Sequence, residues 1–298
     1  MTMLTCGAAT DTGRKRSENQ DRYSCDVAGG LFIVADGMGG AAAGDVAADA
    51  VVTMLPRYLY SYITPSAEQW FGERVASEVK NALCDLSRHL HDKSARSLRQ
   101  AGMGSTVVVA IVREGEALIA HLGDSRVYLM RNGSLNRLTN DHSLAQALVD
   151  SGDMTEAEAG ARSGLRKLTM HMGMSDRAEP DASAIRIDDG DRLVLCTDGL
   201  TTMISEDAIA RLLMEYAEPS AAAQALVDAA NDAGGKDNTT VVVVQAGASI
   251  PAIDAQTATD APISARGLDD GVGLDGTTVR IDSDIPERDI DLHGPFRA

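Results

Sequence analysis

Aromatic side chains are scarce in this chain: one Trp, three Phe and six Tyr make up 3% of its 298 residues. Surfaces that stack nucleic-acid bases depend on such rings, and a net charge of −17 opposes binding to nucleic acid or to an anionic membrane. Hydrophobic residues still make up 44% of the chain, so Val, Leu, Ile, Met and Ala must fill the core. The composition favours a globular protein that binds neither nucleic acid nor membrane.

Cysteine is also scarce, and its spacing matters more than its number. Cys6, Cys25, Cys84 and Cys196 are scattered, with no Cys-x-x-Cys pair. Three of them, all but Cys84, lie in apolar strand candidates, which predicts small buried residues in a reducing compartment. The first residues show no secretory signal, and no apolar run reaches membrane-spanning length. We therefore expect a cytoplasmic protein.

The most informative segment is DGMGG at residues 36–40, which follows the apolar run at residues 31–35. A carboxylate there can bind a hard cation, and glycine lets the backbone approach that cation closely. Asp-Gly is also an ordinary turn, but carboxylates recur at other strand ends: Asp21 opens a strand, Asp198 follows one and Asp237 precedes one. This recurrence favours a shared cation site.

The apolar runs predict many short strands joined by tight turns. Strands are expected over residues 4–10, 23–27, 31–35, 106–113, 117–122, 127–131, 134–138, 184–187, 192–197 and 239–245. The turns at residues 114–115 and 132–133 are hairpin signals, so the pairing should be antiparallel.

Helical patterns lie mostly between groups of strands. They predict helices over residues 44–55, ended by Pro56, and over residues 67–96, with Ser66 and Gln69 as a capping box. Further helices are expected over residues 143–151, 206–216 and 220–232.

The segregation of helices from antiparallel strands predicts an α+β fold, a four-layer αββα sandwich in which helices flank two antiparallel sheets. Residues 1–246 should form one domain. Residues 247–298 are rich in Asp, Ala, Gly, Pro and Thr without a period, which predicts a disordered acidic tail.

Several motifs in a fixed order make the chain resemble the bacterial metal-dependent serine/threonine protein phosphatases of the protein phosphatase 2C type. They are TDTGRKRSENQD at residues 10–21, VADGMGG at 34–40, GST at 104–106, GDSR at 123–126, TDGLT at 197–201 and KDNTT at 236–240. The resemblance spans about residues 5 to 245. It implies hydrolysis of phosphoserine and phosphothreonine by a water nucleophile on a binuclear Mn²⁺ or Mg²⁺ centre.

The chemistry of phosphomonoester hydrolysis fits these residues. Two divalent cations neutralise the phosphate and acidify a water between them, which requires a bridging carboxylate and outer carboxylates. Asp36 is the natural bridge. Asp198 and Asp237 would complete one metal site, and Asp21 with the Gly37 carbonyl would serve the other.

An arginine and a further aspartate extend this prediction. Arg16 stands at the family's arginine position, and its guanidinium fork suits phosphate, so we interpret it as the phosphate clamp and its neighbours in the run RKR as solvated charges. The resemblance implies a third, weaker metal site that involves Asp124 and Asp198. Ser125 and Arg126 are interpreted as structural residues that tie this loop to the core.

The segment of about residues 141–180 resembles the family's mobile flap, which shapes substrate choice. His142 and Ser143, at its start, are candidate substrate contacts, although a role in the loop or at the helix start is the simpler interpretation. The resemblance also implies phosphoprotein partners, a cognate serine/threonine kinase and a forkhead-associated protein among them. We expect a monomer.

Three positions depart from the pattern that the resemblance implies. Gln20 stands where many relatives have Glu, Ala41 where bacterial relatives have His, and Thr202 where relatives often have Asp. They motivate a rival hypothesis, a catalytically weak module that binds phosphoproteins for regulation. A phosphatase of small phosphoesters is a second rival, because one metal pair would serve both substrates.

Overall fold

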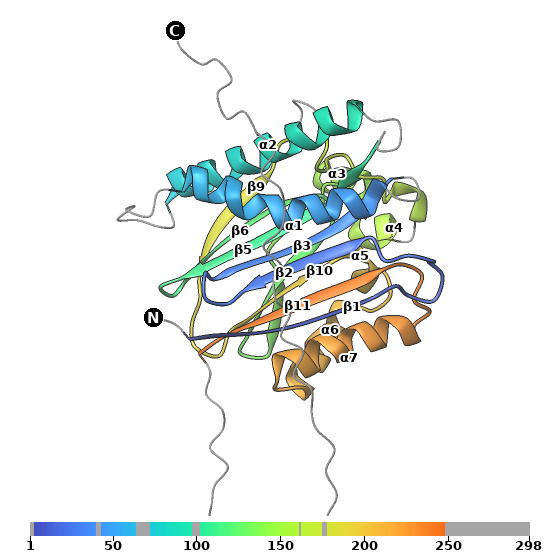
Figure 1. Cartoon of the computed structure of the whole chain (residues 1–298). Coiled ribbons are helices and arrows are strands. Elements are labelled where there is room, and N and C mark those ends of the chain that lie inside the picture. Colours follow the sequence, from blue (N-terminus) through green and yellow to red (C-terminus); the bar gives the residue numbers. More distant parts are fainter. Residues whose placement is uncertain are drawn as a thin grey trace, which may run out of the picture. The chain divides into compact units, whose positions relative to one another are not determined.

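Two antiparallel β-sheets carry the fold (Figure 1). The computed structural model describes residues 3–39, 43–63, 72–96, 102–160, 162–174 and 178–247. One sheet has the order β1 (Leu4–Asp11), β11 (Thr239–Ala246), β10 (Arg192–Cys196), β7 (Arg126–Arg131) and β8 (Ser134–Arg137). The other has the order β2 (Asp21–Asp26), β3 (Leu31–Met38), β5 (Val107–Arg113), β6 (Glu116–Leu122) and β9 (Asp181–Arg186), with β4 (Gly104–Ser105) paired to β3.

Alternation along the strands explains why the sheets stack. In β3, Phe32 and Val34 point into the core between the two sheets, whereas Ile33 and Ala35 point into the core under the helices. In β11, Val242 faces the first of these cores and its neighbours face the opposite helical layer. Because successive side chains point to opposite faces, a strand that is apolar throughout must be covered on both sides.

Helices supply that cover. Helices α1 (Ala43–Tyr62) and α2 (Glu73–Ala95) lie over the sheet that contains β3, and α6 (Glu206–Glu215) and α7 (Pro219–Asp232) lie over the sheet that contains β11 (Figure 1). Short helices α3 (Leu144–Asp150), α4 (Glu156–Gly160) and α5 (Asp198–Thr201) and a 3₁₀ turn, η1 (Ser163–Leu165), lie in the connections. The predicted α+β fold with helices flanking two antiparallel sheets is confirmed.

The predicted end of the first helix at Pro56 is wrong, because α1 continues through it to Tyr62. Buried Leu55 and Leu59 lie on either side of Pro56 and pack into the helical core, so tertiary packing outweighs the backbone hydrogen bond that proline removes. The second helix begins at Glu73, with Gly72 at its N-cap, and not near residue 67. The predicted capping box, Ser66 and Gln69, lies outside the described residues, and so does the predicted tail beyond residue 247.

Two hairpin turns are confirmed by backbone geometry. Glu114 and Gly115 have φ of 52° and 80° between β5 and β6, and Asn132 and Gly133 have φ of 51° and 79° between β7 and β8. Positive φ at both central residues is the signature of the turns that match strand twist. These turns fix the register of the strands that lead to the candidate site.

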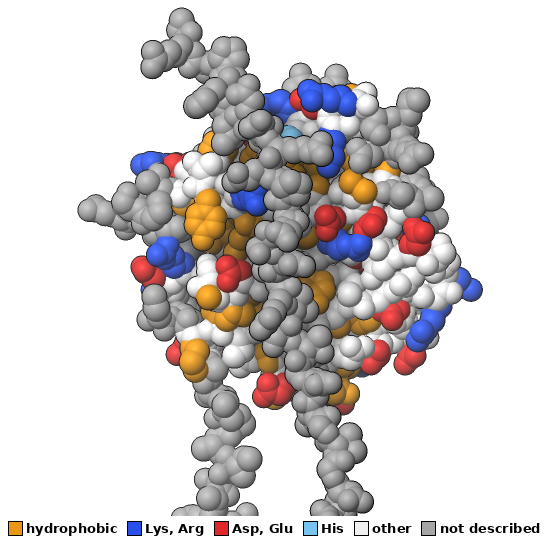
Figure 2. Space-filling view, in the orientation of Figure 1, with side chains coloured by type: hydrophobic (Ala, Val, Ile, Leu, Met, Phe, Trp, Pro, Cys, Tyr) orange, Lys and Arg blue, Asp and Glu red, His pale blue; other side chains and the backbone are white. Residues whose placement is uncertain are grey.

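The surface carries charges of both signs. On the face shown in Figure 2, Asp and Glu side chains are interspersed with Lys and Arg, so this face lacks the continuous basic surface that binds nucleic acid. Among the described residues, none of the helices combines the length and the apolar character needed to span a bilayer.

Candidate metal and phosphate site

The first two predicted ligands are placed by one pair of strands. Asp21 opens β2, Asp36 lies near the end of β3, and the two residues are directly opposite each other in the antiparallel register. Thr106 fixes this end of β3: its hydroxyl accepts a hydrogen bond from the Asp36 amide at 3.0 Å, and its own amide donates to the Asp36 carbonyl at 2.8 Å. The sheet therefore brings two carboxylates to one edge.

The other sheet supplies the next two ligands. Asp198 begins α5 directly after β10, and Asp237 lies in the turn that leads into β11. Thr197, which is fully buried, donates its hydroxyl to Oδ2 of Asp21 at 2.9 Å. This bond joins the two sheets beside the acids, because the charges of Asp198 and Asp237 act on Asp21.

Glycine is required at two positions beside these acids. A Cβ on Gly199 would lie 1.9 Å from the carbonyl oxygen of Asn238, and a Cβ on Gly37 would lie 2.1 Å from the carbonyl oxygen of Gly44. Real Cβ atoms do not approach backbone so closely, so a side chain at either position would push the segments apart. Gly37 thus keeps its backbone packed beside Asp36, where the sequence predicted a carbonyl ligand.

Asn238 organises the loop that carries Arg16. Its side-chain amide donates to the carbonyls of Thr12 at 2.9 Å and Glu18 at 2.8 Å, and its side-chain oxygen accepts from the Gln20 amide at 2.9 Å. Three buried bonds from one side chain fix the loop from both ends. The loop is thus anchored to the strand ends that carry the acids.

The electrostatics show how closely the acids are gathered. Burial raises the pKa of Asp21 to about 7, with the charges of Asp198 and Asp237 adding to the effect. Burial raises the pKa of Asp198 to about 6, with a further contribution from Asp237. Burial, then the charge of Asp21, followed by those of Asp198, Asp124 and Asp237, raises the pKa of Asp36 well above its usual range. Without a cation, these groups repel one another and favour protonation.

The donor set fits a divalent cation. Oδ1 of Asp21 is buried and has no hydrogen-bond partner among the described residues, although buried polar atoms are nearly always paired. Carboxylate oxygens are the ligands that Mg²⁺ and Mn²⁺ prefer. A cation would satisfy the unpaired oxygen and offset the repulsion that raises the pKa values.

Arg16 reaches the same cluster from its loop. One guanidinium nitrogen, Nη2, lies 2.6 Å from Oδ2 of Asp237, and the side chain stays more than half exposed. The bond to Asp237, aided by the charges of Asp36 and Asp198, raises the pKa of Arg16. An exposed guanidinium beside a partly exposed carboxylate can be reached by an anion that enters from solvent.

Asp124 lies beside this cluster. Burial raises the pKa of Asp124 to about 8, and the charges of Asp198 and Asp141 contribute. The next residue, Ser125, is buried and bonds the Thr106 hydroxyl at 2.6 Å. Arg126 donates hydrogen bonds to both carboxylate oxygens of Asp141, at 2.7 and 2.8 Å. Ser125 and Arg126 thus tie the loop to neighbouring segments, as the sequence predicted.

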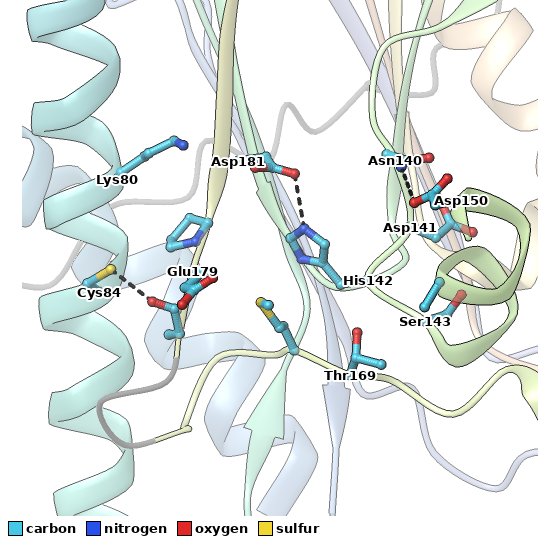
Figure 3. A pocket seen from close by; sticks show the side chains of 14 residues that line it. Lys80, Cys84, Asn140, Asp141, His142, Ser143, Asp150, Thr169, Glu179 and Asp181 are labelled. Carbon is cyan, nitrogen blue, oxygen red and sulfur yellow. Dashed lines mark hydrogen bonds and ion pairs between the residues drawn. The ribbon is translucent and has the colours of Figure 1, made fainter. Parts of the chain in front are cut away.

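His142 and Ser143 line a cavity of about 600 Å³ beside the cluster (Figure 3). The wall also includes Lys80 and Cys84 from α2, and Glu179, which lies just before β9. The Ser143 hydroxyl accepts from the Gln146 amide at 3.2 Å and so caps α3. Asp141 lines the cavity, and its charge also raises the pKa of Asp124 and Asp198. The cavity therefore adjoins the acidic site.

Two histidines and an aspartate near this cavity have the composition of a metal site. The side chains of His121, His142 and Asp181 offer ligand atoms within 4.8 Å of one another. Hydrogen bonds account for the cluster without an ion: His142 Nδ1 accepts from the Gly123 amide at 3.2 Å, and its Nε2 lies 3.2 Å from Asp181. His121 Nε2 lies 2.7 Å from the Asn140 carbonyl, and we interpret the group as a bonded network.

Sequence reasoning missed the supporting residues. Thr197 and Asn238 lay inside recognised motifs, but nothing in their spacing showed that they would bond Asp21 and the Arg16 loop. The only sign of their role in the sequence is that each is a polar residue at the end of an apolar strand. Asp141 gave no such signal, because its partner Arg126 lies 15 residues earlier.

Two of the three positions that depart from the family pattern, Gln20 and Thr202, are described, and both lie close to the site. The Gln20 carbonyl accepts from the Gly37 amide at 3.2 Å, and Thr202 ends α5, with its amide donating to the Asp198 carbonyl at 2.9 Å. Ala41 lies outside the described residues.

Comparison with known proteins identifies the family. The family model described as protein phosphatase 2C matches residues 10–231. A putative protein phosphatase 2C-type of Streptococcus pyogenes is 37% identical over 241 residues, covering 79% of this chain and 94% of that protein. Serine/threonine phosphatase stp of Listeria monocytogenes is 34% identical over 248 residues, covering 79% of this chain and 93% of that protein.

Solved structures share the fold. The catalytic domain of the serine/threonine protein phosphatase PstP, in complex with two manganese ions, superposes with a TM-score of 0.71 at 30% identity, covering 83% of this chain and all of that chain. PppA of Pseudomonas aeruginosa, described as a key regulatory component of T6SS, gives a TM-score of 0.70 at 28% identity, covering 82% of this chain and 97% of that one. The chain belongs to the protein phosphatase 2C family and is a metal-dependent serine/threonine protein phosphatase.

Proposed function

We propose that the chain hydrolyses phosphoserine and phosphothreonine in proteins with two divalent cations, Mn²⁺ or Mg²⁺, held by the carboxylate cluster. When bound, the cations neutralise phosphate charge and lower the pKa of water enough to make it a nucleophile. The observation that carries this proposal is the convergence of acids from both sheets around the unpaired buried oxygen of Asp21.

Each acid has an assigned place. Asp36 would contact both cations, because the charges of Asp21, Asp198, Asp124 and Asp237 all act on its carboxyl group. Asp198 and Asp237 would complete one site. Asp21 and the Gly37 carbonyl belong to the other, and Thr197 orients Asp21 through its hydroxyl.

Arg16 binds the substrate phosphate. Its guanidinium presents a fork of N–H donors that fits phosphate oxygens, and its side chain is more than half exposed to solvent. The contact with Asp237 holds the guanidinium near the acids until an anion competes for it. Phosphate binding would therefore exchange one anionic partner of Arg16 for another.

Asp124, together with Asp198, forms a third and weaker cation site. The charge of Asp198 acts directly on Asp124, which supports a shared ion. An acid at the position of Thr202 would strengthen this site, and its absence predicts that the third ion binds more weakly than the other two.

The cavity beside the cluster receives the protein part of the substrate. His142 and Ser143 belong to its wall, at the start of the segment at residues 141–180 that we expect to act as a flap. Their hydrogen bonds to Gly123 and Gln146 hold them in place, so they would shape the cavity more than they would react.

The serine/threonine phosphatases that this chain resembles act on phosphoproteins, and this suggests its setting. We propose that the chain opposes a serine/threonine kinase in the cytoplasm, acts on proteins that the kinase phosphorylates, including a forkhead-associated protein, and works as a monomer. The four cysteines are all free thiols, which is typical of proteins in a reducing compartment.

Phosphate release from a phosphothreonine peptide tests this proposal. The chain is assayed with Mn²⁺, with Mg²⁺ and with chelator, and Asp36→Asn is compared with the matched change Asp49→Asn on the exposed face of α1. Release should require a cation, persist in Asp49→Asn and fall by at least about 100-fold in Asp36→Asn.

The same assay separates the rival functions. Binding of the phosphopeptide by the folded chain, without release under any cation, would establish a regulatory binder, the function that Gln20 and Thr202 motivate. Faster turnover of a small aryl phosphate than of several phosphopeptides would instead identify a phosphatase of small phosphoesters.

A further inference from the structure

Two cysteines from different sheets meet at one side of the sandwich. Cys6 lies in β1 and Cys25 in β2, and each of these strands is the last in its sheet. The two strands contact each other (Figure 1). Both side chains pack against the core between the sheets, so they face one another from the two layers.

The two sulfur atoms are in direct contact. Sγ of Cys6 lies 3.1 Å from Sγ of Cys25, about 1 Å beyond the length of a disulfide bond. Both side chains are half-buried, whereas the sequence predicted buried core residues. The partial exposure leaves the pair open to a small reactant from solvent.

The remaining cysteines lie elsewhere. Cys84 is on α2 and approaches the Ala178 carbonyl at 3.3 Å. Cys196 is fully buried in the core beneath α6 and α7. Four cysteines allow three disulfide connectivities in sequence alone, and the structure brings only Cys6 and Cys25 into contact.

The contact also couples the acid–base behaviour of the two thiols. The hydrogen bond between the two sulfur atoms lowers the pKa of Cys6 and raises the pKa of Cys25. When two groups interact this strongly, the first proton leaves more easily and the second is retained. One thiolate next to one thiol is the arrangement in which a first oxidation is followed by attack from the neighbour.

We propose that Cys6 and Cys25 form a reversible disulfide when hydrogen peroxide oxidises the pair. In the first step a thiol sulfur attacks the peroxide, the O–O bond breaks, and a sulfenic acid and one water result. In the second step the neighbouring sulfur attacks the sulfenic sulfur, the S–S bond forms, and a second water leaves. Two thiols are oxidised, one peroxide is reduced, and a thiol reductant reverses the change by exchange.

The bond would close a loop that carries part of the candidate site. The two cysteines are 19 positions apart, and the segment between them contains Arg16 and Asp21. Cross-linking its ends restricts the unfolded chain more than the folded one. Oxidation should therefore make the domain harder to unfold, and it links the redox state to the segment that holds the phosphate clamp.

Thiol counting on the folded, full-length chain tests the proposal. The reduced protein in Mg²⁺ is treated with hydrogen peroxide, and its thiols, intact mass and protease-derived peptides are measured. The expected result is the loss of two thiols and two hydrogens, a peptide that joins Cys6 to Cys25, and full recovery with dithiothreitol. The midpoint of thermal unfolding should rise by roughly 5–10 °C.

Matched serine variants keep the test specific. Cys84→Ser should keep both the cross-link and the rise in midpoint, whereas Cys6→Ser and Cys25→Ser should lose both. Folding of each variant is checked by its thermal transition before oxidation. A folded wild-type chain that keeps all four thiols, forms only intermolecular disulfides, or joins Cys84 or Cys196 instead would overturn the proposal, and so would an unchanged midpoint in the cross-linked form.

Discussion

At the scale of single residues, Arg16 is the side chain whose position says most about substrate. It is more than half exposed, and one of its nitrogens lies 2.6 Å from Oδ2 of Asp237, whose side chain is itself partly exposed. Such a pair contributes little free energy in solvent, so the proposed role of Arg16 is to bind the substrate phosphate rather than to stabilise the fold.

Replacing Arg16 by alanine should lower kcat/KM for a phosphothreonine peptide by about 100-fold, because the substrate phosphate loses its forked donor. Arg16→Lys should fall between the wild type and alanine, since lysine keeps the charge but not the fork. Steady-state kinetics in Mn²⁺ measure both changes. The control is Lys15→Ala, whose side chain is also exposed; equal kinetics in Arg16→Ala and Lys15→Ala would contradict the clamp.

Thr197 permits a second residue-scale prediction. Thr197→Val keeps the shape but removes the hydroxyl that donates to Asp21, so Mn²⁺ affinity should fall roughly tenfold to a hundredfold, as it does when groups that orient ligands are lost. Titration calorimetry measures the affinity. Thr201→Val is the matched control, because the Thr201 hydroxyl makes only a 3.5 Å contact with the Asp198 carbonyl; if both variants bind alike, Thr197 does not orient the ligand.

At the scale of elements, α1 shows packing overriding a local signal. Pro56 lies inside the helix, where proline removes one backbone bond and strains the preceding turn. Pro56→Ala should therefore raise the free energy of unfolding by about 1–3 kcal/mol, reduced by the greater freedom of the unfolded chain. Urea denaturation in Mg²⁺ measures this. A lower free energy of unfolding in Pro56→Ala would instead show that the proline stabilises the helix.

The strands were easier to predict than the helices, for a physical reason. Apolar runs ended by Glu114-Gly115 and Asn132-Gly133 fix both the strand and its turn locally. Helix ends depend on neighbours that are distant in sequence, as Leu55 and Leu59 show. In the site, the carboxylates could be predicted because the motifs carry them, whereas the bond from Thr197 to Asp21 spans 176 positions and only the fold reveals it.

At the scale of the whole molecule, the candidate site depends on the packing of two sheets. Asp21 and Asp36 come from one sheet, and Asp198 and Asp237 adjoin strands of the other. A preformed cluster therefore exists only in the folded chain, and a cation that binds it must stabilise folding.

The raised pKa values predict an unusual pH dependence for the metal-free chain. The ordinary pKa of aspartate is 3.8, whereas folding raises that of Asp198 to about 6, Asp21 to about 7 and Asp124 to about 8. Between about pH 4 and pH 8 these aspartates therefore hold more protons in the folded chain than in the unfolded chain. The free energy of unfolding should therefore fall as pH rises from about 4 to about 8.

Denaturation with chelator across that pH range tests this expectation. Saturating Mg²⁺ should reverse the trend, because the cation takes the place of the protons. Asp36→Asn in chelator should show a shallower fall, since one buried carboxyl is removed, while Asp49→Asn should follow the wild type. A stability that rises with pH in chelator would show that the acids are not crowded as described.

The central claim is that Asp36 joins two cations between the sheets. The most direct measurement is the anomalous scattering of manganese from crystals grown with Mn²⁺. We expect two strong peaks in contact with Asp36, one shared with Asp21 and the other with Asp198 and Asp237. Density with no peak at Asp36, or with manganese only among His121, His142 and Asp181, would contradict it.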